Sequence, residues 1–229
     1  MYIERALEPL VRRYSENFKI VAVTGPRQVG KTTMLKHLME EEAESGVDRV
    51  YVTLDNTAIL QTAKEDPALF LQRYRPPVLI DEIQKAPELL PYIKMIVDER
   101  DDCGSVWITG SQPLHLMKAV SESLAGRVGI VEMLGLSHSE VAGTPSEPYL
   151  PSADYFMRRV DMAKPFGVSE AYRQICAGSL PGIRALPDDL RAGGYESYLD
   201  TYIMRDIRDL AQVRDELKFR RFMAACAAL

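Results

Sequence analysis

The chain has 229 residues, 46% of them hydrophobic and 27% charged, with a formal net charge of −5 at pH 7. A chain of this length can bury one substantial core and a smaller second one, so we expect a globular protein of one or two domains. Acidic and basic residues are interspersed along the sequence instead of forming blocks. This pattern argues against a dedicated surface for nucleic acid or for an anionic membrane.

The cysteines Cys103, Cys176 and Cys226 are widely separated and form no C-x-x-C pair, and the three histidines are equally scattered. The pattern indicates a reducing compartment and argues against a redox motif or a metal site built on these residues. The amino-terminal residues carry acidic side chains and lack the apolar core of a secretory signal. No apolar run approaches the roughly 18 residues of a membrane span. We therefore predict a cytoplasmic protein with no membrane partner.

Five short apolar runs in the first part of the chain are predicted to be buried strands, because they are too continuously apolar for a sheet with one wet face. They span residues 19–25, 49–55, 77–82, 105–111 and 127–134. Helical periodicity is predicted between them, over residues 31–46, 87–100 and 113–127. Strands that are buried on both faces imply a parallel sheet covered by helices, an αβα arrangement.

Prolines and a glycine interrupt every regular period over residues 143–154, so we place a domain boundary there. The predicted domains are residues 1–143, and residues 144–229 as the start of a helical region. Its helical pattern is broken at 178–182 and continues over residues 190–213. The last pattern ends in Ala-Ala-Leu without a cap or a polar tail, which leaves carbonyls and apolar surface without an evident partner. We expect a longer natural protein.

The segment GPRQVGKT at residues 25–32 fits the pattern G-x-x-x-x-G-K-[ST] and lies between a predicted strand and a predicted helix. Glycines at both ends let backbone N–H groups point at phosphate oxygens, Lys31 would bridge the β- and γ-phosphates, and the Thr32 hydroxyl would bind Mg²⁺. The predicted nucleotide-binding residues are Gly25, Pro26, Arg27, Gln28, Val29, Gly30, Lys31, Thr32 and Thr33. The alternative is a glycine turn that binds nothing.

The segment PPVLIDEIQ at residues 76–84 is the feature that favours hydrolysis. Asp81 ends a predicted buried strand, where a carboxylate is costly unless it meets a cation, and Mg²⁺ held at Thr32 would supply that cation through a water. Glu82 follows and would polarise a water for attack on the γ-phosphate. The alternative is that both acidic residues begin a solvated turn.

Two further positions complete the predicted site. Ser111, with Thr109 as the alternate, follows a strand and would orient the attacking water or contact the γ-phosphate, and a capping or turn role is an equal alternative. Arg127 lies between a predicted helix and the next strand, where it would reach the γ-phosphate of a neighbouring subunit as an arginine finger. The alternative for Arg127 is an intramolecular salt bridge.

The order of these motifs resembles that of the AAA+ ATPases. The glycine loop is followed by LIDEIQ at residues 79–84, ITGS at 108–111 and SLAGR at 123–127. More narrowly, the chain resembles prokaryotic ATP-binding proteins in which an AAA-type domain precedes a C-terminal domain of unknown function. GSLPG at 178–182 and YLDTYIMRDI at 198–207 extend this resemblance toward the end of the chain.

The resemblance implies a five-stranded parallel sheet in the order 5-1-4-3-2, with ATP and Mg²⁺ at the carboxyl ends of the strands. It implies that Lys31 and Thr32 serve the phosphates and Mg²⁺, and that Asp81 and Glu82 are the acidic pair. Ser111 would be the sensor and Arg127 the finger that makes a homo-oligomer possible.

Arg5 matches an arginine that often precedes the first strand in such proteins, with no role to assign to it. Relatives continue beyond the position of Leu229 through a winged-helix-like region and a further domain. DNA binding is therefore expected only from that missing region, and the resemblance supplies no pathway.

The leading interpretation is an ATPase whose hydrolysis drives or times a conformational change in attached domains or in a protein partner. The alternative is a nucleotide-gated switch with little turnover that recruits a protein or nucleic-acid partner. A small-molecule kinase is a third interpretation, and the sequence lacks an obvious acceptor pocket or pair of lid arginines for it.

Overall fold

The computed structural model describes residues 2–111, 123–144, 149–163, 166–203 and 216–227. Most of the helix predicted over residues 113–127 lies outside this part, as does the end of the helical pattern predicted up to residue 213. The chain divides into two compact units. The first comprises residues 1–167 and 179–181, and the second comprises residues 168–178 and 182–229.

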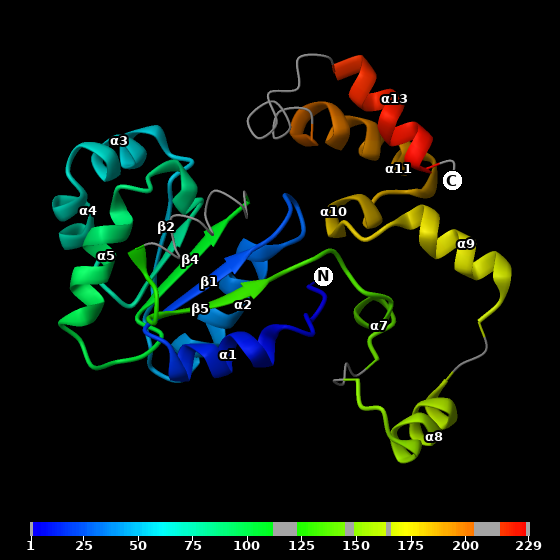
Figure 1. The fold of residues 1–229 in the computed structure, drawn as a ribbon, viewed down its shortest axis with the longest axis horizontal. Coiled ribbons are helices and arrows are strands. Elements are labelled where there is room, and N and C mark those ends of the chain that lie inside the picture. The colour runs from blue at the N-terminus through cyan, green and yellow to red at the C-terminus, as the bar shows by residue number, and fades with distance from the viewer. Residues whose placement is uncertain (1, 112–122, 145–148, 164–165, 204–215, 228–229) are drawn as a thin grey trace. The chain divides into compact units, whose positions relative to one another are not determined.

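A five-stranded parallel sheet forms the centre of the first unit, in the order β2-β3-β4-β1-β5 (Figure 1). Its strands are β1 (Ile20–Thr24), β2 (Val50–Thr53), β3 (Val78–Asp81), β4 (Val106–Gly110) and β5 (Val128–Glu132). Taken from the other edge, the order is 5-1-4-3-2, so the fold class and strand order expected from the sequence are confirmed. Each strand falls within one of the five predicted apolar runs.

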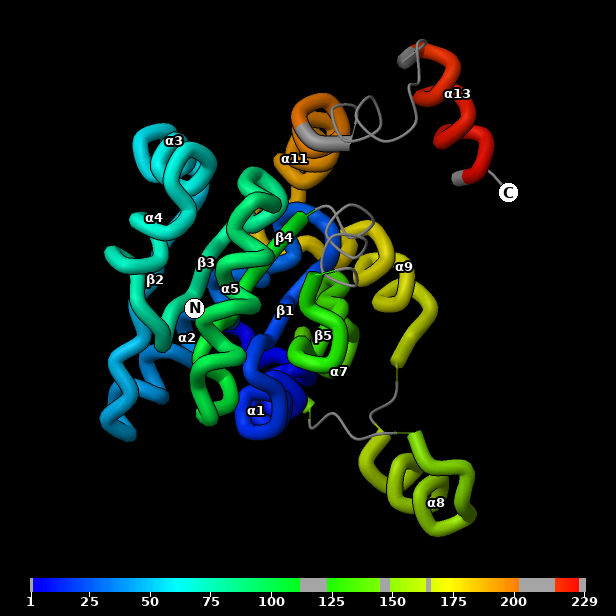
Figure 2. Tube along the Cα trace, turned by 60° about the vertical axis from the view of Figure 1, so that its left-hand side comes forward, coloured from blue at the N-terminus to red at the C-terminus, as the bar shows by residue number. Residues whose placement is uncertain are grey.

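Helices cover both faces of this sheet, because the strands alternate apolar side chains between the two faces. On one face, Ile20 and Ala22 of β1 pack in the main core with the helices α3 (Thr57–Glu65), α4 (Pro67–Arg73) and α5 (Leu89–Asp98). Figure 2 shows these three helices gathered beside one another. Trp107 of β4 faces the opposite way and donates from Nε1 to Ser15 of α1 (Glu8–Asn17).

The helices α1, α3 and α4 are among those not predicted from the sequence, although α3 and α4 carry capping signals. Asn56 Oδ1 accepts hydrogen bonds from the backbone N–H groups of Ala58 and Ile59, and Asp66 Oδ1 accepts one from Leu69. Pro67 occupies the first position of α4, where its missing N–H costs nothing. The caps were readable, but the helices are too short to show a clear period.

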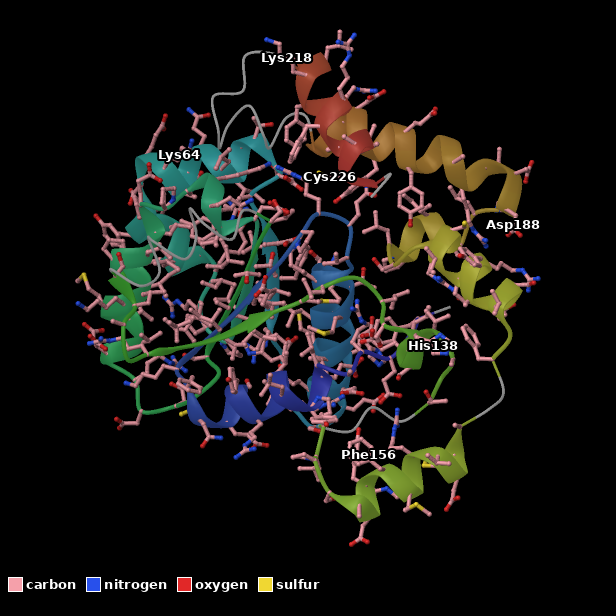
Figure 3. All side chains as sticks on the ribbon, turned by 45° about the vertical axis from the view of Figure 1, so that its right-hand side comes forward. Lys64, His138, Phe156, Asp188, Lys218 and Cys226 are labelled. Carbon is pink, nitrogen blue, oxygen red and sulfur yellow. The ribbon has the colours of Figure 1, made fainter. Side chains whose placement is uncertain are left out.

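The phosphate-loop segment leads into α2 (Lys31–Glu44), whose buried side chains include Met34, Leu35 and Leu38. After β5 the first unit continues through α7 (His138–Val141) and α8 (Ala153–Met162). The His138 ring lies 5.0 Å from the Phe166 ring, and Phe156 of α8 is 48% exposed; Figure 3 labels His138 and Phe156.

The second unit is helical, which confirms the helical region expected after the sheet. Its elements are α9 (Val168–Ala177), most of α10 (Pro181–Arg184), α11 (Asp188–Tyr198), a π-helical turn η2 (Leu199–Ile203) and α13 (Glu216–Ala227). Tyr195 donates to the Ala177 carbonyl at 3.0 Å and Arg184 donates to the Gly178 carbonyl at 2.6 Å, which ties the end of α9 to the next two helices. The domain boundary predicted after residue 143 stays a prediction.

Candidate functional site

The loop between β1 and α2 has the backbone that its glycines permit. Gly25 has φ 140° and Gly30 has φ 97°, both in the region that side chains with a Cβ rarely adopt. A Cβ on Gly25 would lie 2.0 Å from the carbonyl oxygen of Met133, so this position accepts no other residue without a rearrangement. The loop is therefore a tight curl pressed against the end of β5.

Lys31 is 6% exposed and turns back across this loop. Its Nζ donates to the carbonyl oxygens of Gly25 at 3.0 Å and Pro26 at 2.8 Å. The ammonium group is thereby held inside the curl, at the amino end of α2, where the helix dipole is positive. The loop therefore holds a positively charged group at the amino end of α2.

The other predicted loop residues differ in exposure. Val29 is buried, Arg27 is half-buried, and Pro26, Gln28 and Thr33 are exposed. Gln28 has φ 61°, a left-handed conformation that is uncommon for a residue with a side chain.

Thr32 and Asp81 meet, although 49 residues separate them in sequence. The Thr32 hydroxyl lies 3.0 Å from each carboxylate oxygen of Asp81. Asp81 is the last residue of β3 and is 6% exposed, so its carboxylate does not belong to a solvated turn. The first turn of α2 and the carboxyl end of β3 therefore share one polar cluster.

Two more hydroxyl groups contact Asp81. Thr109 of β4 donates to Oδ1, and Tyr51 of β2 donates to Oδ2 at 3.1 Å. The sequence had offered Thr109 as an alternate to Ser111, and it had missed Tyr51. Thr53 is the register partner of Asp81, and Tyr51 lies two residues earlier in β2. The Tyr51 hydroxyl reaches the Asp81 carboxylate only because the tyrosine side chain is long. That contact depends on register and has no local sequence signal.

The surroundings of Tyr51 change the pKa of its hydroxyl group. Burial, the charge of Asp81 and the hydrogen bond to Asp81 together raise the pKa of Tyr51 to about 12. The Lys36 ammonium also lies 3.8 Å from the centre of the tyrosine ring. Tyr51 is therefore a neutral hydrogen-bond donor to Asp81 over the whole physiological pH range.

Glu82 begins a second group of contacts beside Asp81. Its backbone is left-handed, with φ 60° and ψ 42°, where β3 passes into the short 3₁₀ turn at Ile83–Lys85. Ser111 donates to Glu82 Oε2 at 3.2 Å, and Gln84 Nε2 donates to the same oxygen and lies 3.3 Å from Ser111 Oγ. Ser111 itself is 5% exposed. The predicted Glu82 and Ser111 are thus in direct contact.

Gln84 was not singled out from the sequence, although it stands in the same DEIQ segment. Its amide nitrogen joins Glu82 to Ser111. Its carbonyl Oε1 is buried, and no donor for it lies within hydrogen-bond distance among the residues that the structure describes. A buried amide oxygen in this state has room to accept one hydrogen bond from a ligand or a water.

Arg127 lies at the opposite end of the strands from these groups. Its carbonyl accepts from Ile20 N at the start of β1, so the residue belongs to the amino-terminal edge of the sheet. The guanidinium pairs with Asp98, at 2.5 Å from Nε to Oδ1 and 2.9 Å from Nη2 to Oδ2. The hydrogen bond from Arg127 lowers the pKa of Asp98. The intramolecular pair named as the alternative is present, and the finger role stays a prediction.

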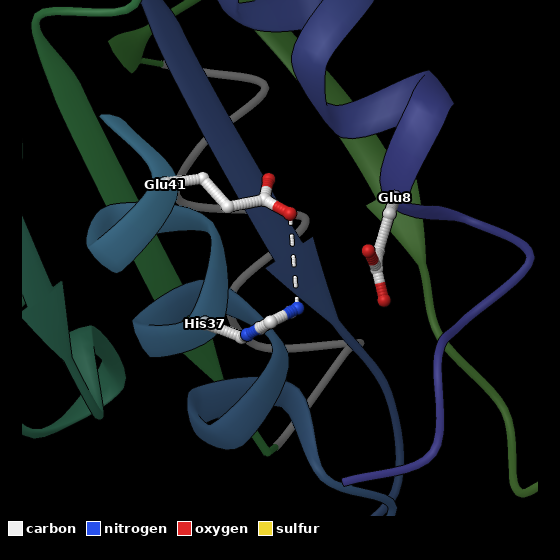
Figure 4. Close-up of side chains that lie close together, drawn as sticks. All are labelled: Glu8, His37 and Glu41. Carbon is white, nitrogen blue, oxygen red and sulfur yellow. Dashed lines mark ion pairs between the residues drawn. The ribbon is translucent and has the colours of Figure 1, made fainter. Parts of the chain in front are cut away.

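One group of three potential metal ligands, Glu8, His37 and Glu41, occurs in the described part of the chain (Figure 4). Arg12 forms ion pairs with both glutamates of this group. Arg12 Nη2 lies 3.3 Å from Glu8 Oε2 and 2.6 Å from Glu41 Oε2. Because the guanidinium supplies the positive charge that the two carboxylates require, the group is an ion-pair network and not a metal centre.

Comparison with known families agrees with the fold and the motifs. The chain matches a family model described as an AAA domain over residues 17–142, and a second model described as Domain of unknown function (DUF8612) over residues 169–229. Because the first match covers more than half of the chain, the protein belongs to this family of AAA domains. The arrangement expected from the sequence, an AAA-type domain before a domain of unknown function, is confirmed.

The curated relatives are uncharacterized proteins of Mycobacterium bovis and Mycobacterium tuberculosis. Each is 29% identical to this chain over 201 residues, which is 87% of this chain and 38% of the relative. The chain therefore spans 38% of the length of the relatives that it matches.

Among solved structures, the Walker-type ATPase of Pyrococcus abyssi superposes with a TM-score of 0.54 and 15% identity, over 93% of this chain and 77% of that one. At this identity the likeness shows the P-loop NTPase fold alone. Within the described residues, no helix is both long and apolar enough to cross a membrane.

Proposed function

We propose that this protein binds ATP together with Mg²⁺ and hydrolyses it, and that hydrolysis drives or times a conformational change in attached domains or in a partner. One observation carries the proposal: the Thr32 hydroxyl meets both oxygens of the Asp81 carboxylate at 3.0 Å, directly beside the curl that holds Lys31. A phosphate-binding loop and an acidic strand end that converge in this way are the two parts that phosphoryl transfer from a nucleotide requires.

The loop would bind the phosphates through its backbone. Inward N–H groups and the amino end of α2 attract anions, and Lys31 would exchange its carbonyl partners for phosphate oxygens. The glycines at positions 25 and 30 support this role because the loop could not adopt its curl with a Cβ at Gly25.

The residues fit Mg²⁺ by the chemistry of their donors. This ion prefers oxygen ligands, and it is usually held by a hydroxyl and one or two carboxylates together with phosphates. Thr32 and Asp81 would hold it, with Tyr51 and Thr109 fixing the orientation of the carboxylate. When bound, the ion would neutralise part of the charge on the β- and γ-phosphates.

Glu82 would act as the general base. Its carboxylate would take a proton from a water whose oxygen attacks the γ-phosphorus, while the bond from that phosphorus to the ADP oxygen breaks and phosphate leaves. Ser111 and Gln84 contact Glu82 Oε2 and would hold it in position. The Ser111 hydroxyl would also contact the γ-phosphate and so act as its sensor.

One further partner belongs to the same proposal. Arg127 would act on the nucleotide of a neighbouring copy of the chain, which would make the active form a homo-oligomer. Cytoplasmic location remains the expectation from composition.

The test is Glu82→Gln, which keeps the shape of the side chain and removes the base. We expect ATP affinity, measured by calorimetry with Mg²⁺, to stay within about threefold and turnover to fall by about 100-fold or more, the usual contribution of a general base. Glu65→Gln, on the exposed surface of α3, is the matched control and should change neither value.

The outcomes separate the alternatives. Absence of ATP and ADP binding by the folded wild-type protein would overturn the proposal. Binding with slow turnover that is indifferent to Glu82→Gln would favour the nucleotide-gated switch. Transfer of phosphate to an organic acceptor would favour the kinase.

A further inference from the structure

Arg5 is a buried arginine that stands outside the phosphate loop but contacts it. It is 5% exposed, and its guanidinium joins segments that are far apart in sequence. Nη1 donates to the Val29 carbonyl at 2.7 Å, Nη2 donates to the Leu134 carbonyl at 2.8 Å, and Nε donates to Glu140 Oε1 at 2.9 Å. A second contact of Nη2 reaches the Gly135 carbonyl at 3.2 Å.

The contact with Val29 bears on how the loop presents its amides. The carbonyl of a trans peptide and the N–H that follows it point in opposite directions. Because Arg5 holds the Val29 carbonyl on its own side of this peptide, the N–H of Gly30 points to the opposite side. A Cβ on Gly30 would lie 3.7 Å from Arg5 Nη1, so the guanidinium also packs against this peptide.

Only arginine can make this set of contacts. Its guanidinium is planar and offers five donors in a fixed fork, whereas lysine offers a single point of charge. A buried guanidinium is stable only when its donors find acceptors, and the acceptors here come from the loop, the turn after β5 and the first turn of α7. Without the guanidinium, the Val29 carbonyl would lose its hydrogen bond, whereas most hydrogen bonds of the fold would remain.

Glu140 fixes the guanidinium in turn. Burial alone would raise the pKa of Glu140, but hydrogen bonds from the backbone of Ser137 and Ala6 and from Arg5 lower it. Glu140 also closes the capping box of α7 with Ser137. The Glu140 carboxylate is thus held ionised beside Arg5. It orients the Nε of Arg5 toward α7, in the segment that follows β5.

We propose that Arg5 is a positioning residue of the phosphate loop: it holds the Val29 carbonyl outward, so that the N–H of Gly30 faces the bound phosphate, and it ties this peptide to the turn at residues 134–135. The inference rests on the proposed function, because it assigns Arg5 a role toward the nucleotide. The residue acts through the loop and touches no reacting atom.

The experiment compares Arg5→Lys with Arg13→Lys, a matched substitution at an exposed arginine of α1. The affinity for ADP is measured by calorimetry with Mg²⁺, and the amide of Gly30 is followed by NMR in ¹⁵N-glycine-labelled protein. Arg5→Lys is expected to weaken ADP binding about tenfold, the effect of one lost hydrogen bond to a charged group, and to reduce the shift that ADP induces at Gly30. KM for ATP should rise more than kcat falls. Arg13→Lys should behave as wild type.

A purely structural role would lower the unfolding temperature without moving the Gly30 signal of the folded protein, and that result would overturn the proposal. Glu140→Gln, which keeps Arg5 and removes its charged partner, is the second variant and should weaken ADP binding by a smaller factor. If both variants fail to fold, Arg5 belongs to the folding of the unit and the positioning role is wrong. If wild-type protein binds no ADP, the proposed function fails first, which distinguishes the two failures.

Discussion

Polar residues have different roles at the two ends of the strands in the central sheet. The carboxyl edge is the side where the strands end, and the amino edge is the side where they begin. At the carboxyl edge, Asp81 is surrounded by hydroxyl groups, those of Thr32, Tyr51 and Thr109. At the amino edge, charged groups form close pairs of opposite sign, in which Arg49 binds Glu42 at 2.8 Å and Arg127 binds Asp98 at 2.5 Å.

The difference separates a binding site from a structural network. Neutral hydroxyl groups do not cancel the negative charge of a carboxylate, so that charge can attract a hydrated cation. A carboxylate that is paired with a guanidinium has its charge neutralised. A pocket of about 520 Å³ does lie at the amino edge, lined in part by Arg49 and Trp107. Arg49 stacks 3.8 Å above the Trp107 ring, so this region is organised by packing and ion pairs.

The largest expected effect is on chemistry at the carboxyl edge. Asp81→Asn removes the charge but keeps an oxygen acceptor for the hydroxyls, so turnover should fall by about 100-fold or more and the midpoint of thermal unfolding should not fall. Steady-state ATPase assays with a Mg²⁺ titration and a thermal scan measure both. A marked loss of stability with unchanged turnover would mean that Asp81 is structural and would break the comparison.

The next effect is on stability at the amino edge. The side chain of Arg49 is 3% exposed, and Arg49→Met removes its ion pair with Glu42 and its hydrogen bond to the Gly104 carbonyl. We expect the free energy of unfolding to fall by about 3 kcal/mol, as for other broken buried pairs. Urea unfolding followed by circular dichroism measures it, with Arg13→Met as the control. Turnover per folded molecule should be unchanged, and a selective loss of turnover would contradict the assignment.

Glu140 tests a charged pair near the carboxyl edge, that with Arg5. Because the pKa of Glu140 is lowered in the folded protein, its stabilisation is fully present above the unfolded value of 4.5 and is lost as the pH falls through the folded pKa. Glu140→Gln should therefore cost about 2 kcal/mol at pH 7, with the difference from wild type shrinking below pH 4.5. A difference that stays constant from pH 7 to pH 3 would show that the charge of Glu140 contributes nothing.

Arg127→Ala should have the smallest effect on the isolated chain. The pair with Asp98 is exposed and lies at the edge away from the phosphate loop, so ATP affinity and the unfolding midpoint should change little. ATPase assays over a range of protein concentration provide the sharper measurement. An ATPase rate per molecule that rises with protein concentration in wild type, and no longer rises in Arg127→Ala, would establish the finger role across a neighbouring subunit.

Local patterns were sufficient for several parts of the site. The spacing from Gly25 to Thr32 predicted the phosphate loop, and the apolar residues before Asp81 predicted a buried strand that ends in a carboxylate. The strand order came from the resemblance to a family and not from the residues themselves. Helices α3 and α4 were missed even though Asn56 and Asp66 cap them, because short helices carry too few residues to define a period.

What the sequence alone determined is the set of chemical groups and the elements that carry them, since glycine spacing and apolar runs act over a few residues. Only the tertiary structure decided which distant groups meet. Tyr51 reaches Asp81 through strand register, Arg5 reaches Val29 and Glu140 across 24 and 135 residues, and Arg127 faces Asp98 at the opposite edge of the sheet. Such contacts are set by the packing of the whole sheet, for which no short stretch of sequence carries the information.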